Sequence, residues 1–193
     1  MKYRSILLFG APGAGKGTQG KVLGVIPNFF HCACGDVFRN LRADSPLGQI
    51  FIKYSSRGQL VPDETTVRLW RQFVKSSTQI GRFHPEHDTL VLDGIPRNVP
   101  QAKMLKDTLN VVAVFYLKSA DEKSLIHRIP RRAIKENRLD DANLAIIRER
   151  LKTYEQETLP LLKFYGRKRV YQINADQSPA KVLSDILRIA AKK

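Results

Sequence analysis

The sequence predicts an α/β fold in which a five-stranded parallel sheet is flanked by helices. Two observations lead to this fold class: short apolar runs alternate with helix-length segments, and the runs are rich in the β-branched and aromatic residues typical of buried parallel strands. The expected strands are Ile6–Phe9, Phe29–Ala33, Thr89–Leu92, Val111–Leu117 and Val170–Ile173. Because the segments between them are long enough to be crossover helices, we expect helices on both faces of the sheet.

Helical periodicity is clearest in the last third of the chain. Mostly apolar residues recur there at steps of three and four, and they predict the longest helix, starting near Asp140 and Asp141. These residues are Leu144, Ile147, Leu151, Tyr154, Thr158 and Leu161. The segment Ser119–Glu122 has the spacing of a capping box that opens another helix. Pro130 is expected to end that helix and to leave residues 131–139 as a connecting loop.

The composition is that of an ordinary globular domain with one core, at 193 residues, 42% hydrophobic and 26% charged. Subtracting 18 acidic from 33 basic side chains leaves a net charge of +15, which predicts an anionic partner without identifying it. Cys32 and Cys34 are too few for a disulfide framework, so we expect a reducing, cytoplasmic compartment. The apolar runs fall well short of the ~20 residues that span a bilayer, and no membrane association or targeting segment is expected.

A glycine-rich loop, G-A-P-G-A-G-K-G-T, follows the first expected strand and precedes a helix. In that context its backbone N–H groups can surround phosphate oxygens, the helix N-terminus adds positive potential, and Lys16 adds a full charge. The strict phosphate-loop pattern has its hydroxyl directly after the lysine, whereas here Gly17 intervenes and Thr18 supplies the hydroxyl for Mg²⁺. A tight turn without a ligand is the alternative. The expected nucleotide-binding residues are Gly13, Ala14, Gly15, Lys16, Gly17 and Thr18.

This loop resembles the phosphate loop of adenylate kinases and their nucleoside monophosphate kinase relatives, which have the P-loop NTPase fold. Three further segments resemble motifs of the same family, and the resemblance spans essentially the whole chain. They are Gly35–Arg39, Gly58–Glu64 and Leu92–Asn98.

The segment Leu92–Asn98 contributes an acidic residue and an arginine at the end of a strand. Asp93, beside the phosphate loop, can hold the hydration shell of Mg²⁺, and Arg97 can reach a phosphate in a forked geometry. Gln101 matches the glutamine with which the family reads the adenine edge of AMP, since an amide offers both a donor and an acceptor. Gly94 is expected beside the same nucleotide.

The resemblance implies further AMP-binding residues. Arg39 would hold the AMP phosphate, and Leu60, Val61 and Pro62 would form a backbone wall against the acceptor base. Ala33 and Cys34 stand where the family carries serine and threonine, so Cys34 would contact the base through a thiol.

Arginines near a second mobile element also match family positions. Arg128 and Arg132 are expected to bind ATP, and Arg138 and Arg150 to bind AMP, with Arg148 as an alternative to Arg150. The lid between Arg128 and Asp140 has no cysteine, so the zinc lid of some relatives is not expected. His84 and His87 are expected to be surface histidines.

The resemblance therefore implies one kinase domain over residues 1–193. Its core comprises residues 1–34, 63–128 and 140–193, with a monophosphate-binding subdomain at about 35–62 and a short lid at about 129–139. The implied reaction is reversible, Mg²⁺-dependent transfer of the γ-phosphoryl group of ATP to AMP, giving two ADP. The expected catalytic residues are Lys16, Arg97, Arg132, Arg138 and Arg150. A monomer without an obligate protein partner is the default expectation.

Two alternatives remain at the level of sequence. A UMP/CMP kinase is favoured by Asn98 and Cys34 and opposed by Gln101. A nucleic-acid-binding P-loop NTPase is favoured by the net charge of +15. Because the chain shows no stacking motif, helix-turn-helix signal or basic tail, nucleic acid is not expected as a partner.

Overall fold

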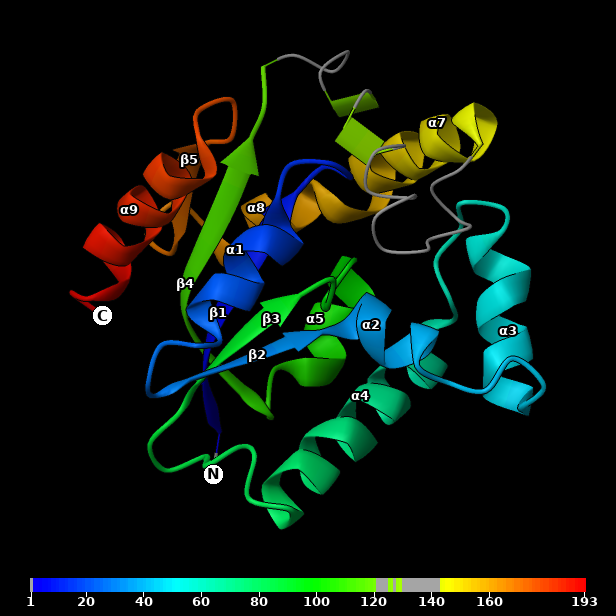
Figure 1. Ribbon diagram of the computed structural model, residues 1–193, viewed down its shortest axis with the longest axis horizontal. Helices are drawn as coiled ribbons and strands as arrows, with labels where there is room; N and C mark the ends of the chain where they lie inside the picture. Colours follow the sequence, from blue (N-terminus) through cyan, green and yellow to red (C-terminus); the bar gives the residue numbers. More distant parts are fainter. Residues whose placement is uncertain (1, 121–124, 127, 130–142) are drawn as a thin grey trace.

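The five predicted strands form one parallel sheet, which confirms the fold class. The computed structural model describes residues 2–120, 125, 126, 128, 129 and 143–193. The strands are β1 (Tyr3–Gly10), β2 (Phe29–Ala33), β3 (Thr89–Asp93), β4 (Leu109–Lys118) and β5 (Val170–Asn174). Their order is β2-β3-β1-β4-β5, and every neighbouring pair is parallel (Figure 1). Ala33 and Leu8 both pair with Asp93, so the carboxyl ends of three strands meet at one edge of the sheet.

Helices cover both faces of the sheet because alternate residues of each strand point to opposite sides. Leu7 and Phe9 join the larger apolar cluster, together with Trp70 of helix α4, whereas Ile6 and Leu8 join a second cluster. The larger cluster includes α4 (Asp63–Gln79), α5 (Val99–Leu105) and α8 (Pro160–Tyr165), and the second includes α1 (Lys16–Leu23) and α9 (Pro179–Ala190).

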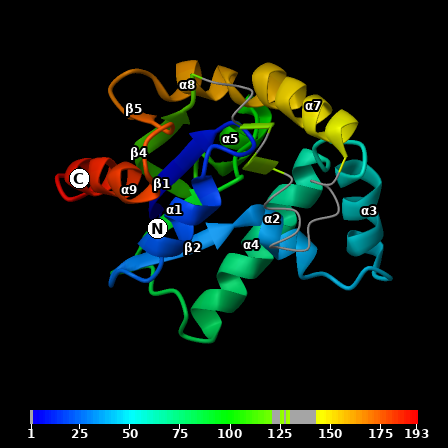
Figure 2. The same ribbon diagram turned by 45° about the horizontal axis from the view of Figure 1, so that its top comes forward.

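Two short helices follow β2 before the chain enters α4. They are α2 (Cys34–Arg39) and α3 (Pro46–Ser55), and α3 lies apart from the strands at the edge of the molecule (Figures 1 and 2). Ser45 caps α3, since its hydroxyl oxygen accepts a hydrogen bond from the Gly48 N–H at 3.1 Å. Together, α2 and α3 form an insertion between β2 and α4.

The predicted long helix differs from the structure in its continuity. Its described part begins at Leu144, where the Asn143 side chain caps the first turn by accepting from the Ala145 N–H, and Asp140 and Asp141 lie outside the described residues. The helix then divides into α7 (Leu144–Thr153), a π-helix η2 (Tyr154–Thr158) and α8, which starts at Pro160. Of the described α-helices the longest is instead α4, with 17 residues.

Some predicted features lie outside the described residues. These are Pro130, the loop at 131–139 and the acidic half of the expected capping box. Ser119, the first residue of that box, donates a hydrogen bond to Asp176.

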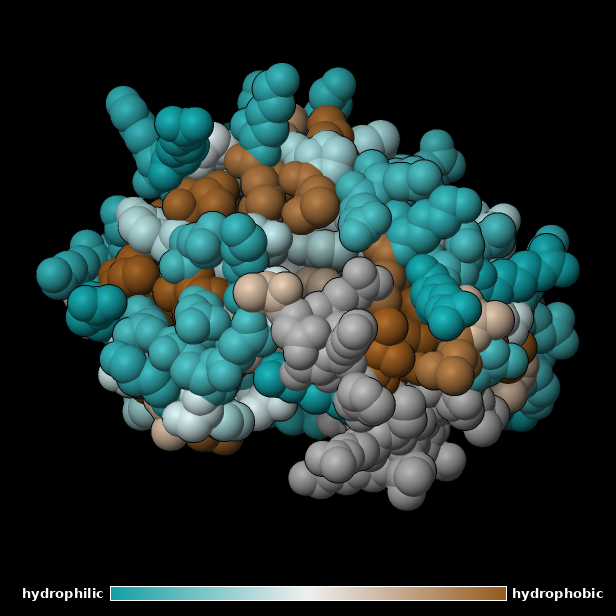
Figure 3. Space-filling model, turned by 90° about the horizontal axis from the view of Figure 1, so that it is seen from above, coloured by the Kyte–Doolittle hydropathy of each residue, from teal (hydrophilic) through white to brown (hydrophobic). Residues whose placement is uncertain are grey.

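Hydrophilic side chains cover much of the face seen from above, with smaller apolar areas between them (Figure 3). Within the described part of the chain, no helix is both long and apolar enough to cross a membrane.

Candidate active site

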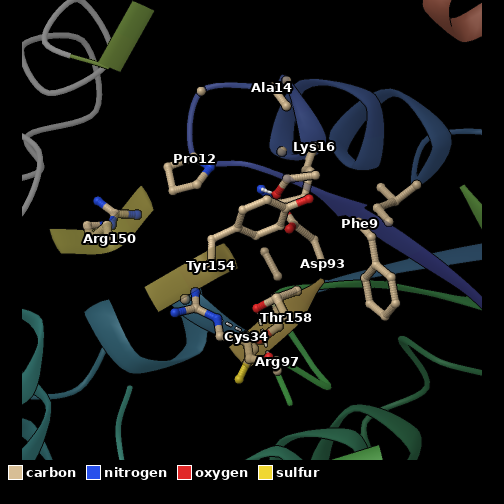
Figure 4. A pocket seen from close by; sticks show the side chains of 18 of the residues that line it. Phe9, Pro12, Ala14, Lys16, Cys34, Asp93, Arg97, Arg150, Tyr154 and Thr158 are labelled. Atoms are coloured by element: carbon tan, nitrogen blue, oxygen red, sulfur yellow. Dashed lines mark hydrogen bonds between the residues drawn. The ribbon is translucent and has the colours of Figure 1, made fainter. Parts of the chain in front are cut away.

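A cavity of about 650 Å³ lies at the carboxyl edge of the sheet, where ligands of open α/β sheets bind. Its walls come from the loop after β1, the start of α2, the segment after β3, and the α7–η2 region (Figure 4). One cavity thus gathers segments that are far apart in the sequence.

The phosphate loop forms one wall of the cavity in a backbone conformation that favours glycine. Gly10, Gly13 and Gly15 have φ angles of 152°, 85° and 93°, and Gly15 directly precedes the first turn of α1. The Lys16 ammonium donates hydrogen bonds to the carbonyls of Gly10 at 2.7 Å and Ala11 at 3.0 Å. The lysine charge therefore lies over the loop, at the positive end of a helix.

Two hard oxygen donors lie close to this loop. Thr18 and Asp93 both line the cavity, and a Cβ added at Gly17 would be 3.6 Å from Asp93 Oδ2. Hydroxyl and carboxylate oxygens are the ligands that Mg²⁺ takes alongside phosphate and water. The residues therefore fit a magnesium ion held mainly by a bound nucleotide.

Arg97 is held on the opposite wall by backbone contacts. Its Nε donates to the Gly94 carbonyl at 3.1 Å, and its own carbonyl accepts from the Thr158 hydroxyl at 2.7 Å. Gly94 has a φ of 77°, and a Cβ there would be 3.2 Å from an Arg97 terminal nitrogen. The guanidinium keeps its two terminal nitrogens in a forked arrangement that suits a phosphate.

Three more arginines line the cavity from other elements. Arg39 forms an ion pair with Asp36 and is 23% exposed. Arg128 donates to the Ala175 carbonyl at 3.2 Å. Arg150 projects from α7, whereas Arg148 is exposed and is not among the described lining residues, so the geometry favours Arg150.

Apolar groups form the far end of the cavity. Cys34 is 3% exposed, and burial raises the pKa of its thiol to about 11. Phe38 and Phe51 stack with centroids 5.3 Å apart, and both rings line the cavity, as Leu60 does. This end is shaped for a flat, largely apolar group such as a base.

Most predicted site residues meet in this one cavity. Those that line it are Gly13, Ala14, Gly15, Lys16, Gly17, Thr18, Cys34, Arg39, Leu60, Val61, Asp93, Gly94, Arg97, Gln101, Arg128 and Arg150. Pro62 instead lines a smaller neighbouring cavity of about 330 Å³. Arg132 and Arg138 lie outside the described residues.

Tyr154 is a site residue that sequence reasoning assigned only to helix packing. Its ring lies near the middle of the cavity, between Lys16 and Arg97 (Figure 4). The pKa of the Tyr154 phenol is raised mainly by burial and, to a smaller extent, by the neighbouring Tyr116. The phenol is therefore neutral at physiological pH. The sequence signal that could have indicated this role is the pattern R-L-x-x-Y, which Arg150, Leu151 and Tyr154 form.

The cavity also has a wall that no motif indicated. Ala175 and Gln177, between β5 and α9, and Pro179, the first residue of α9, line the cavity together with Gln19 of α1. The Gln19 amide nitrogen donates to the Pro179 carbonyl at 3.0 Å, which connects the two helices.

Comparison with known proteins identifies a family. A family model described as adenylate kinase matches residues 8–170. The chain is 37% identical over 191 residues to an adenylate kinase of Cyanothece sp., covering 95% of this chain and 93% of that protein. It is 33% identical over 193 residues to an adenylate kinase of Flavobacterium psychrophilum, covering 95% and 97%. An adenylate kinase of Parabacteroides distasonis is 37% identical over 166 residues, or 83% of each chain.

Proposed function

The chain belongs to the adenylate kinase family and is a nucleoside monophosphate kinase, and from this premise we propose that it transfers the γ-phosphoryl group of ATP to AMP, reversibly and with Mg²⁺, giving two ADP. The observation that carries the proposal is a single cavity with two cationic stations. Lys16 and the phosphate loop form one station, and Arg39, Arg97 and Arg150 form the other. Two phosphorylated ligands can therefore face each other across it.

We assign ATP to the station built by the phosphate loop. Residues 13–18 bind the β- and γ-phosphates through backbone N–H groups, with Lys16 neutralising charge. Arg128 approaches from the strand-β4 side, and the wall from Ala175 to Pro179 faces the donor base.

We assign AMP to the opposite station. Arg39 and Arg97 bind its phosphate, and the base lies between Cys34 and the wall formed by Leu60 and Val61, with Gln101 at its edge. The backbone of Pro62 continues that wall towards the smaller cavity.

Thr18 and Asp93 are the residues that would hold Mg²⁺, largely through water. When bound, the ion neutralises charge on the β- and γ-phosphates. Two unpaired, buried thiols, Cys32 and Cys34, support a reducing, cytoplasmic location. Because one chain supplies all of the described cavity walls, we propose that the protein acts as a monomer without a protein partner.

The chemistry requires positioning more than proton transfer. The acceptor phosphate is already an anionic nucleophile near pH 7, so the protein must align it in line with the γ-phosphoryl group and neutralise two polyanions that repel each other. Arg97 and Arg150 reach the space between the stations. Arg132 and Arg138 are proposed to neutralise the remaining negative charge of the two nucleotides. Closure of residues 35–62 over the ligands is proposed to exclude water, the competing acceptor.

A substrate panel tests the proposal. ADP release from ATP·Mg²⁺ is measured by a coupled assay with AMP, CMP, UMP or GMP as acceptor, and AMP is expected to give the highest kcat/KM. A preference for UMP or CMP would replace the proposal with a UMP/CMP kinase. Asn98, the residue that favoured that alternative, lines only the smaller cavity, whereas Gln101 lines the larger one.

A further inference from the structure

Gln101 is almost completely buried, at 1% exposure, yet its amide lies at the wall of the acceptor station. An amide forms complementary hydrogen bonds with a base only if its oxygen faces a donor of the base and its nitrogen faces an acceptor. We propose that Asp63 is a positioning residue that locks the orientation of the Gln101 amide and thereby sets the preference for adenine over bases with the opposite hydrogen-bond pattern. This inference rests on the proposed assignment of AMP to that station.

The lock consists of two hydrogen bonds to groups of fixed polarity. Gln101 Nε2 donates to Asp63 Oδ1 at 2.8 Å, and Gln101 Oε1 accepts from the Arg97 backbone N–H at 2.7 Å. A carboxylate only accepts and a backbone N–H only donates. A flipped amide would place oxygen against carboxylate and nitrogen against N–H, so both bonds would be lost and replaced by repulsion.

Asn98 extends the same network and holds Asp63 in place. Its Nδ2 donates to Asp63 Oδ1 at 2.9 Å, while its Oδ1 accepts from the Gln101 backbone N–H at 2.9 Å. The orientation of Asn98 is therefore set by the backbone of α5. Asp63 is the first residue of α4 and directly follows the wall at 60–62, so the network joins that wall to the segment 97–101.

The two hydrogen bonds leave the Gln101 amide with a fixed donor and acceptor pattern for a ligand. Of the two Nε2 hydrogens and the two Oε1 lone pairs, one of each is used by these bonds, so one donor and one acceptor remain in fixed positions. Adenine presents an amino donor beside a ring-nitrogen acceptor, whereas hypoxanthine, nearly the same shape, presents a carbonyl acceptor beside an N–H donor. Only a flipped Gln101 amide would match hypoxanthine.

The test measures discrimination between AMP and IMP. The kcat/KM of each acceptor is measured at saturating ATP·Mg²⁺ in the full-length wild type and in Asp63→Ala. Because the alanine removes one of the two hydrogen bonds that orient the Gln101 amide and leaves only the bond from the Arg97 backbone N–H, the AMP/IMP ratio is expected to fall about tenfold, the equivalent of one buried hydrogen bond, while the KM for ATP stays unchanged.

Two variants separate positioning from helix stability. Glu64→Ala removes the other acidic residue in the first turn of α4 and costs the same favourable interaction with the helix dipole, so it should keep the wild-type ratio. Asp63→Asn should also keep it, because the Asn98 Nδ2 donor requires the oxygen of residue 63 to face it, and that oxygen still accepts from Gln101. If Asp63→Ala does not fold, Asp63→Ser, whose hydroxyl is too short to bridge to Gln101, carries the same expectation.

The kinetic results distinguish failure of the proposed function from failure of the inference about Asp63. A wild type that does not phosphorylate AMP overturns the proposed function and this inference with it. A wild type that uses AMP while Asp63→Ala or Asp63→Ser retains its AMP/IMP ratio overturns the inference alone. The same is true if the wild type uses AMP and IMP equally, or if Glu64→Ala lowers the ratio as much as Asp63→Ala.

Discussion

Replacing Arg97 by lysine keeps the positive charge but removes the forked geometry. In the structure Arg97 Nε donates to the Gly94 carbonyl at 3.1 Å, which aims the two terminal nitrogens into the cavity. Lysine has a single nitrogen, so it cannot bond to Gly94 and also offer two donors to a phosphate.

The magnitude follows from the bonds that are lost. A hydrogen bond to a charged group contributes about 1.5–3 kcal/mol, and each 1.4 kcal/mol is a factor of ten. Losing one phosphate bond therefore lowers kcat/KM for AMP by roughly 10- to 150-fold. Stability should change by less than about 1 kcal/mol, because the Arg97 side chain is only partly buried and fills no apolar core position.

The assay varies AMP at saturating ATP·Mg²⁺ and follows ADP release, with urea unfolding as the measure of stability. Arg71→Lys is a matched control, since Arg71 also donates to a backbone carbonyl, that of Met104 at 3.0 Å, but lies on the exposed surface of α4. If Arg97→Lys retained kcat/KM for AMP within threefold of the wild type, or if Arg71→Lys lost as much, the role assigned to the guanidinium fork would be refuted.

Three further results are expected. Thr158→Val removes the hydroxyl that donates to the Arg97 carbonyl and should lower kcat/KM for AMP about three- to tenfold in steady-state kinetics without changing the KM for ATP; unchanged kinetics would show that this contact does not hold Arg97. Because burial raises the pKa of Cys34 to about 11, alkylation by iodoacetamide, followed by mass spectrometry, should be slow at pH 8 and rise about tenfold per pH unit until it levels off near pH 11; rapid labelling at pH 8 would contradict this. Burial lowers the pKa of His31 below 6.5, so the unfolded state binds the proton more readily and the free energy of unfolding should fall as pH drops below 6.5. Urea titrations at pH 7 and pH 5 should show a smaller fall in His31→Asn than in the wild type, and equal falls would argue against it.

The parts of the site that sequence predicts well are local. The phosphate loop needs a strand, glycines and a helix within a few residues, and Gly10 to Thr18 supply all of them in order. By contrast, no local pattern predicts that Arg39 and Leu60 lie at the cavity. Only the resemblance to a family placed them beside Arg97. Spacing along the chain says nothing of how α2 and α3 fold over the sheet.

The parts that sequence misses depend on small changes of helical register and on distant pairing. The steps of three and four through Tyr154 and Thr158 predict a continuous helix, but a π-helix inserts extra residues per turn and directs Tyr154 into the cavity and Thr158 to Arg97. Likewise Gln101 was expected to face only a base. Its partner Asp63 is 38 residues away and meets it only because α4 packs against α5.

The distribution of buried polar side chains connects the stability of the fold to its site. Among the described residues the buried polar side chains are Ser5, Gln19, Thr66, Ser77, Thr89, Asn98 and Gln101. Burying an amide without partners costs roughly 1–3 kcal/mol, so large buried amides need a structural or functional reason. All three of these amides line a cavity: Gln19 and Gln101 the larger, Asn98 the smaller.

These amides do little for the apolar core, and an apolar side chain of similar volume would fill the same space without the desolvation cost. What they add is orientation. In both glutamines the amide nitrogen donates to an acceptor that cannot reverse its polarity, the Pro179 carbonyl for Gln19 and the Asp63 carboxylate for Gln101. Each amide is therefore set before any ligand arrives, so a ligand does not have to order it on binding. Two of the described buried amides thus lie where a fixed hydrogen-bond pattern has a use, in the walls of one cavity.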